Sequence, residues 1–267
     1  MIFMKMVAAG NDFVVVNAAN LPAVPLKRLA EKICQRKYGI GADGLLLCEE
    51  SRSADAKMRI FNPDGSEAEM CGNGARCFSL YVNLKQKRKT RLKIETKAGM
   101  VSAEVRGETV KIKLTDPKAM RLDTLIPINN RKLRVNFINT GVPHTVIFVE
   151  GLDGIDVAGL GRQIRYHKYF APAGTNVNFV EVVSRNSARI RTYERGVENE
   201  TLACGTGSSA AALITAVKLG LVGKNMVKVI TAGGETLKVY FEKTRTGFND
   251  VWLEGEVKIV YGGEYHV

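Results

Sequence analysis

The chain has 267 residues, of which 45% are hydrophobic and 25% are charged, and its formal net charge at pH 7 is +12. This length allows one large or two modest domains, each with a core of its own. No apolar run approaches the ~18 residues that a membrane helix needs. The N-terminal residues also lack the uninterrupted apolar stretch of a signal peptide. We therefore expect a cytoplasmic protein without a membrane partner.

The cysteines and the excess positive charge indicate neither a metal site nor a nucleic-acid partner. The five cysteines include no Cys-x-x-Cys pair and no metal-ligand spacing with histidine, so we expect reduced thiols and no metal. Six of the nine residues 85–93 are basic, but no aromatic residues are interleaved and no nucleic-acid-binding motif accompanies them. We interpret this run as a solvated loop. An anionic small substrate would also suit the net charge.

Hydrophobic periodicity predicts a strand-rich first half that contains two helices. The first helix is expected over 26–38, between Pro25 and Gly39, and the second over 72–84. The expected strands are 2–7, 13–17, 45–48, 58–61, 92–95, 101–105 and 110–114.

The second half repeats this order. Helices are expected over 157–166 and over 205–219, the latter ending before Gly220. The expected strands are 133–138, 145–149, 178–182, 190–193, 227–230, 236–240 and 251–253. Residues 10–14, 41–45, 59–62 and 71–74 resemble residues 141–146, 174–179, 191–194 and 204–207, at offsets of 131 to 133 residues. These anchors indicate a duplicated unit.

The duplication predicts an α/β protein (α+β type) of two pseudo-symmetric domains. The helix over 205–219 is apolar on nearly every side, so we expect a twisted, mostly antiparallel sheet or barrel around a central helix in each half. The boundary is expected near Pro117–Asn130, which carries two prolines and no strong period. The expected domains are 1–118, to which a C-terminal strand over about 257–267 returns, and 119–256.

Each half carries one Cys-Gly-x-Gly motif at the predicted start of a helix, with Cys71 in the first and Cys204 in the second. The N–H groups and the macrodipole of a helix start attract anions and lower the pKa of a thiol from ~8.5 towards neutrality. Two such starts could bind a carboxylate between two thiols, one removing the α-proton and the other returning one. That is racemisation or epimerisation without a cofactor. A buried structural cysteine is the simpler interpretation of Cys34, Cys48 and Cys77.

The sequence resembles the diaminopimelate epimerase family, which acts without a cofactor. The matching stretches are GNDFVVV (10–16), GIGADGLLL (39–47), FNPDGSEAEMCGNGARC (61–77), NTGVPHTVIFVE (139–150), GTNVNFVEVV (174–183) and YERGVENETLACGTGSSAA (193–211). The resemblance implies two α/β domains with the active site between them. It also implies interconversion of LL- and meso-diaminopimelate, a small amino-acid substrate, in the synthesis of lysine and cell-wall precursors.

The resemblance further implies the roles of individual residues. Cys71 and Cys204 form the acid–base pair, Glu194 binds the substrate amino group near the thiols, and His144 helps to position or deprotonate one of them. Arg195 suits a distal carboxylate, because its planar fork can bind one bidentately; a structural ion pair with Glu198 is the alternative. The other implied binding residues are Gly72, Asn73, Gly205 and Thr206 at the reacting carboxylate, and Asn11, Asn62 and Asn176 at the far end.

Two positions depart from some members of that family, and other functions stay open. Gly44 replaces a glutamine and Val142 replaces an asparagine, which favours a looser site that also accepts lysine or another long basic amino acid. Proline or hydroxyproline racemases also use paired cysteines, whereas phenazine-type isomerases lack them. A cysteine hydrolase using Cys204 and His144 would leave Cys71 idle. A non-catalytic anion-binding or nucleic-acid module is a further alternative, and the oligomeric state is open, a homodimer included.

Overall fold

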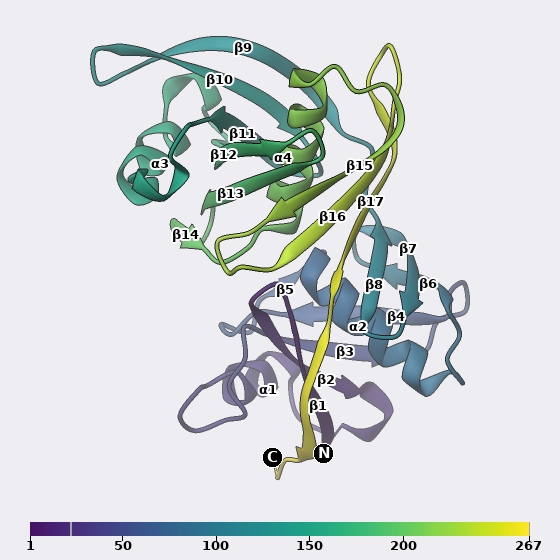
Figure 1. The fold of residues 1–267 in the computed structure, drawn as a ribbon. Helices are drawn as coiled ribbons and strands as arrows, with labels where there is room; N and C mark the ends of the chain where they lie inside the picture. The colour runs from purple at the N-terminus through teal and green to yellow at the C-terminus, as the bar shows by residue number, and fades with distance from the viewer. Residues whose placement is uncertain (22, 267) are drawn as a thin grey trace. The chain divides into compact units, whose positions relative to one another are not determined.

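The computed structural model describes residues 1–21 and 23–266, which divide into two compact units (Figure 1). Unit 1 consists of Met1–Lys113 and the C-terminal segment from Gly255, and unit 2 is Leu114–Glu254. In the described part of the chain, no helix is long and apolar enough to cross a membrane.

The strands of unit 1 pair in the order β18-β1-β2-β3-β4-β6-β7-β8, and the short strand β5 adds to β4. The pairs β2–β3 and β4–β6 are parallel, and the others are antiparallel. The strands are β1 (Ile2–Ala8), β2 (Asn11–Asn17), β3 (Gly44–Glu49), β4 (Ala56–Phe61), β5 (Glu67–Ala68), β6 (Arg91–Thr96), β7 (Gly99–Arg106), β8 (Thr109–Lys113) and β18 (Lys258–Glu264).

Unit 2 repeats this topology in the order β9-β10-β11-β12-β13-β15-β16-β17, with β14 on β13. The parallel pairs, β11–β12 and β13–β15, stand at the same places as in unit 1. The expectation of two pseudo-symmetric, mostly antiparallel halves is confirmed. The strands are β9 (Lys118–Ile128), β10 (Arg131–Asn139), β11 (Pro143–Phe148), β12 (Asn176–Ser184), β13 (Ser187–Glu194), β14 (Asn199–Thr201), β15 (Gly223–Ile230), β16 (Thr236–Lys243) and β17 (Phe248–Glu256).

Each unit contains one central helix, α2 (Gly72–Lys85) in unit 1 and α4 (Gly205–Lys218) in unit 2. The helix α2 contacts β1–β4 and β6–β8, and α4 contacts β10–β13, β15 and β16, as Figure 1 shows for each unit. Every residue of α4 from Gly207 to Ala216 is buried. Small side chains on all sides let the curved sheet approach this helix closely.

Two amphipathic helices cover the outer faces of the sheets, α1 (Leu26–Ile33) on unit 1 and α3 (Val157–Arg165) on unit 2. Short 3-10 helices lie at Ala18–Asn20, Leu152–Gly154 and Lys168–Phe170. The expected extension of the first helix to residue 38 is wrong. The chain folds back after Cys34, because Gly41 N–H bonds to the Ile33 carbonyl and Gly39 lies too close to the helix end to carry a Cβ atom.

The segment expected to be an aperiodic boundary forms the strand β9, which belongs to unit 2. Ile126 is buried, and the other residues of β9 are exposed or half-buried. No alternation of apolar and polar residues therefore marks this strand in the sequence. Backbone hydrogen bonds to β10 define this strand instead, and Pro127 is tolerated there as it is on an edge strand.

An ion pair between a buried lysine and a half-buried aspartate joins the first two strands. Lys5 Nζ lies 2.7 Å from Asp12 Oδ2 and also donates to the Gly41 carbonyl, while Arg36 binds Asp12 through two N–H groups at 2.9 and 3.0 Å. Burial alone would raise the pKa of Asp12, but the hydrogen bonds from Arg36 and Lys5 outweigh it and hold this pKa well below its usual range. The ionised carboxylate therefore stabilises the folded chain.

We expect Asp12→Asn to lower the free energy of unfolding by about 3 kcal/mol in a urea titration at pH 7, because it leaves the Lys5 ammonium buried without its carboxylate. Since the pKa of Asp12 is lower in the folded than in the unfolded chain, its contribution is present above the unfolded pKa of about 4 and is lost as the pH falls further. That acid-dependent loss should be smaller in the variant.

The control is Glu31→Gln, which removes an exposed pair 4.0 Å from Lys27 on α1. It should change stability by less than about 0.5 kcal/mol. Equal effects of the two substitutions would contradict a stabilising role for the Lys5–Asp12 pair.

Candidate active site

Cys71 is the N-cap residue of α2, with extended backbone angles of φ −142° and ψ 123°. Its Sγ accepts the Gly74 N–H at 3.5 Å. The side chain is half-buried, and it lies where the unpaired N–H groups and the macrodipole of a helix start favour an anion. The structure thus places this thiol where a thiolate is stabilised.

Asn73 and Asn11 are brought together beside that helix start. The Asn73 amide donates to Asn11 Oδ1 at 2.6 Å, and Asn11 donates to Asp43 Oδ2 at 3.2 Å. Arg76, a buried residue of α2, donates to Asn73 Oδ1 at 2.7 Å and holds the amide in its orientation. An ideal Cβ at Gly72 would have Ile112 as its nearest neighbour, at 3.7 Å, so there is room at the first residue of the helix.

Asn62 belongs to a different group of contacts in unit 1. It lies in the turn after β4, where its backbone N–H bonds to the Ser66 carbonyl and its amide donates to Ser66 Oγ at 2.9 Å. These contacts stabilise the turn itself. The side chain is half-buried.

Cys204 is the N-cap residue of α4 and is 9% exposed. Its Sγ lies 3.5 Å from Thr206 Oγ1, which in turn lies 3.0 Å from His144 Nε2. The Thr206 carbonyl accepts the Thr140 hydroxyl at 3.0 Å. The imidazole thus reaches Cys204 through the Thr206 hydroxyl.

His144 is completely buried at the start of β11. Burial, aided by the positive charge of Arg195, lowers the pKa of His144 to about 3. The imidazole is therefore neutral at physiological pH and is a poor base for a thiol. That His144 helps to position or deprotonate one of the thiols stays a prediction.

Glu194, Arg195 and Asn176 lie together at the end of β13 and the start of β12. The Thr201 hydroxyl donates to Glu194 Oε2 at 2.9 Å, but burial outweighs this bond and raises the pKa of Glu194. The Asn176 amide oxygen accepts the Arg195 backbone N–H at 2.8 Å.

The Arg195 guanidinium donates to the Ala173 carbonyl at 3.0 Å. Glu198, which was the candidate for a structural pair with Arg195, instead binds Arg165 at 3.1 Å. Because a carbonyl is neutral, this contact does not neutralise the positive charge of Arg195. That charge suits an anionic ligand.

The two positions that depart from some family members lie in different surroundings. An ideal Cβ at Gly44 would meet the Phe61 carbonyl at 3.1 Å and the Phe13 ring at 3.3 Å, so a side chain there would face protein atoms. Val142 is half-buried in the turn before β11, where its carbonyl accepts the Thr140 N–H. Glycine at residue 44 is therefore explained by packing.

Sequence analysis missed Asn178, whose amide contacts the imidazole of His144 at 3.2 Å. The signal was present, because Asn178 is two residues from Asn176 on one strand and so points to the same face. Arg76 was missed as well, since a buried arginine on a helix has no distinctive spacing.

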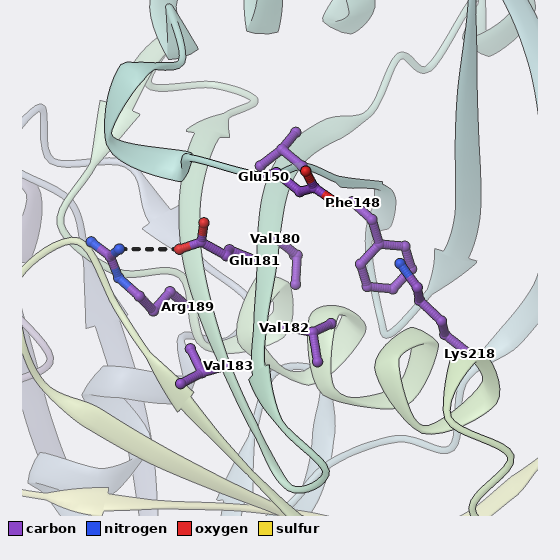
Figure 2. Close-up of a pocket in the computed structure, with 9 residues that line it drawn as sticks. Phe148, Glu150, Val180, Glu181, Val182, Val183, Arg189 and Lys218 are labelled. Atoms are coloured by element: carbon purple, nitrogen blue, oxygen red, sulfur yellow. Dashed lines mark hydrogen bonds and ion pairs between the residues drawn. The ribbon is translucent and has the colours of Figure 1, made fainter.

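A hollow of about 540 Å³ lies over β11 and β12, away from these residues (Figure 2). Three of its charged side chains, Glu181, Arg189 and Lys218, already have protein partners. Arg189 binds Glu181 at 3.1 Å, and Lys218 Nζ lies 4.0 Å above the Phe148 ring. The described residues also contain no cluster of three His, Cys, Asp or Glu side chains that could hold a metal ion.

Comparison with known proteins identifies relatives over the whole chain. A sequence model of diaminopimelate epimerase matches residues 3–120 and 136–259. A diaminopimelate epimerase of Aquifex aeolicus is 42% identical over 98% of this chain and 96% of its own length. That of Archaeoglobus fulgidus is 45% identical over 87% of this chain and 86% of its own.

Two solved structures share the fold at low sequence identity. A Bacillus anthracis phenazine biosynthesis protein of the PhzF family has a TM-score of 0.77 at 19% identity, over 100% of this chain and 99% of its own. A hydroxyproline epimerase from Agrobacterium vitis, solved with trans-4-hydroxy-L-proline, has a TM-score of 0.71 at 17% identity, over 98% and 91%.

Proposed function

We propose that this chain, which belongs to the diaminopimelate epimerase family, interconverts LL- and meso-diaminopimelate by two-base proton transfer without a cofactor. The observation that carries the proposal is the repeated placement of a cysteine. Cys71 and Cys204 are the N-cap residues of equivalent central helices, α2 and α4, in two units of the same topology. Two-base racemisation needs one acid–base group on each face of the carbon, and the duplication supplies two thiols.

In the proposed reaction, one cysteine as thiolate removes the α-proton and the other as thiol donates its proton to the opposite face. The C–H electron pair moves into the carboxylate, which takes up negative charge until the new C–H bond forms. Backbone N–H groups at the starts of α2 and α4 stabilise that charge, as an oxyanion site does. Gly72, Asn73, Gly205 and Thr206 are the residues proposed to supply this site.

The remaining binding roles are also part of the proposal. Glu194 faces the substrate ammonium, and its burial strengthens the attraction between the two charges. Arg195 binds the distal carboxylate, since among the described residues its guanidinium donates to a neutral carbonyl, that of Ala173. Asn11, Asn62 and Asn176 complete the contacts to the far end of the substrate. A diamino dicarboxylate suits this set of amide, cationic and anionic groups.

A cytoplasmic location and small-molecule chemistry belong to the same proposal. A catalytic thiol pair needs a reducing compartment, and the chain has no Cys-x-x-Cys pairs or other disulfide framework. Neither a nucleic acid nor a membrane has a role in this chemistry. A homodimer stays a prediction, and the exposed apolar residues Ile259, Val260 and Tyr261 of β18 offer the surface on which to test it.

Proton NMR in heavy water with LL-diaminopimelate tests the function. We expect the α-proton signal to disappear as the meso isomer forms, and no comparable exchange with single enantiomers of lysine or proline. Turnover of lysine at a similar kcat/KM would establish the broader racemase instead. Exchange with none of these amino acids would contradict the epimerase proposal.

A further inference from the structure

A chain of hydrogen bonds within unit 2 leads from the strand β12 to the thiol of Cys204. The Asn178 amide nitrogen lies 3.2 Å from His144 Nδ1, and His144 Nε2 lies 3.0 Å from Thr206 Oγ1. Thr206 Oγ1 lies 3.5 Å from Cys204 Sγ. Asn178 and His144 are both completely buried, so this chain is shielded from solvent at one end and reaches a thiol at the other.

The partners of Asn178 determine the direction of the first two bonds in this chain. The Asn178 nitrogen donates to the Thr145 carbonyl at 3.0 Å, and its oxygen accepts the Thr192 hydroxyl at 3.0 Å. Because a carbonyl can only accept, the second N–H of the amide points to His144 Nδ1, which must then be unprotonated. The proton of the neutral imidazole is on Nε2 and is donated to Thr206 Oγ1. Because the Thr206 oxygen accepts that proton, its own hydroxyl proton is available to donate to Cys204 Sγ, 3.5 Å away.

Unit 1 has apolar side chains at the equivalent places. Asn178 pairs with Thr192 between β12 and β13, as Leu46 pairs with Ile60 between β3 and β4. His144 stands where unit 1 has Phe13, at the first parallel pair of its strand. The same fold therefore forms without these polar groups, so packing alone does not require them in unit 2. The duplication has made the surroundings of the two thiols chemically different.

We propose that Asn178 is a positioning residue that holds His144 as the neutral Nε2–H tautomer, so that the Thr206 hydroxyl donates a hydrogen bond to the Cys204 thiolate and stabilises it. This inference rests on the proposed role of Cys204 in epimerisation. A charged neighbour, Arg195, acts on the imidazole in the same sense, because its positive charge opposes a second proton on the ring. His144 thus acts on the thiol as a fixed donor and takes up no proton itself.

The test measures the pH dependence of iodoacetamide alkylation at Cys204, followed by mass spectrometry of its peptide. Thr206→Val removes the hydroxyl while keeping the shape, and it should raise the apparent pKa of this thiol by about one to two units, the effect of one hydrogen bond to a charged group. Thr206→Ser keeps the hydroxyl and should keep the wild-type profile. Asn178→Asp should also raise the thiol pKa, since a carboxylate accepts a proton from Nδ1 and reverses the tautomer.

Nitrogen-15 NMR of the His144 ring provides a second measurement on the unsubstituted protein. We expect a protonated Nε2, an unprotonated Nδ1 and no titration between pH 5 and 8. A protonated Nδ1, or a Thr206→Val profile identical to wild type, would overturn the proposal. Neither measurement uses a substrate, so failure here is distinguishable from failure of the epimerase function. Turnover of diaminopimelate with an unchanged Cys204 profile would retain the function and reject this role for Asn178.

Discussion

Cys71→Ala and Cys204→Ala should each abolish the interconversion of LL- and meso-diaminopimelate, lowering kcat/KM by about 10²–10⁴-fold or more. Inversion at carbon needs a base on one face and an acid on the other, so a single remaining thiol cannot complete the reaction. Chiral chromatography of the product measures inversion. Deuterium uptake at the α-carbon, measured by NMR, separately reports whether the remaining thiolate still removes a proton.

The matched control is Cys48→Ala, which makes the same chemical change in unit 1. Burial raises the pKa of Cys48 to about 11, so this residue stays a thiol at neutral pH and should contribute little to turnover. The protein should therefore keep its activity within a few-fold. Retention of inversion by Cys71→Ala or by Cys204→Ala would replace the two-thiol mechanism with one that uses a single cysteine.

The fold could be predicted from the sequence where buried side chains produce a helical or strand-like pattern of apolar residues. The central helix α4 was predictable because small apolar residues occupy all its sides, and strands with one buried face alternate visibly. The prediction failed where backbone contacts define the structure. β9 has Ile126 as its buried side chain, and α1 ends at Ile33 because the chain folds back onto the helix end. Neither feature changes the composition of its segment.

The candidate site was predictable to the extent that its residues lie in short motifs. The motif Cys-Gly-x-Gly indicated that Cys71 and Cys204 stand at helix starts, and the structure has both as N-cap residues. The protonation state of the His144 imidazole depends instead on Asn178 and Arg195, which approach it from β12 and from the end of β13. The sequence around His144 does not reveal this environment, so it left open whether the imidazole positions a thiol or deprotonates it.

Gly207→Ala should lower kcat/KM by at least about 100-fold, because it displaces the groups around Cys204. An ideal Cβ at Gly207 would lie 2.6 Å from Asn178 Oδ1 and 3.3 Å from Cys204 Sγ. Both are too close, so the amide and the thiol must move apart. Overpacking costs about 1–3 kcal/mol, while alanine in a helix recovers about 1 kcal/mol over glycine. The variant should therefore fold, and urea titration measures its remaining stability.

Gly74→Ala makes the same substitution at the equivalent position of α2 and is the matched control. There the ideal Cβ would meet Leu46 Cδ2 at 3.3 Å and Ile60 Cδ1 at 3.4 Å, which are ends of side chains that can shift. The substitution also leaves in place the backbone N–H of residue 74, which donates to Cys71 Sγ. We expect the fold-decrease in kcat/KM to be at least ten times smaller than in Gly207→Ala. Equal losses would mean that both thiols depend only on close packing of the helix start, and that the polar groups around Cys204 add nothing.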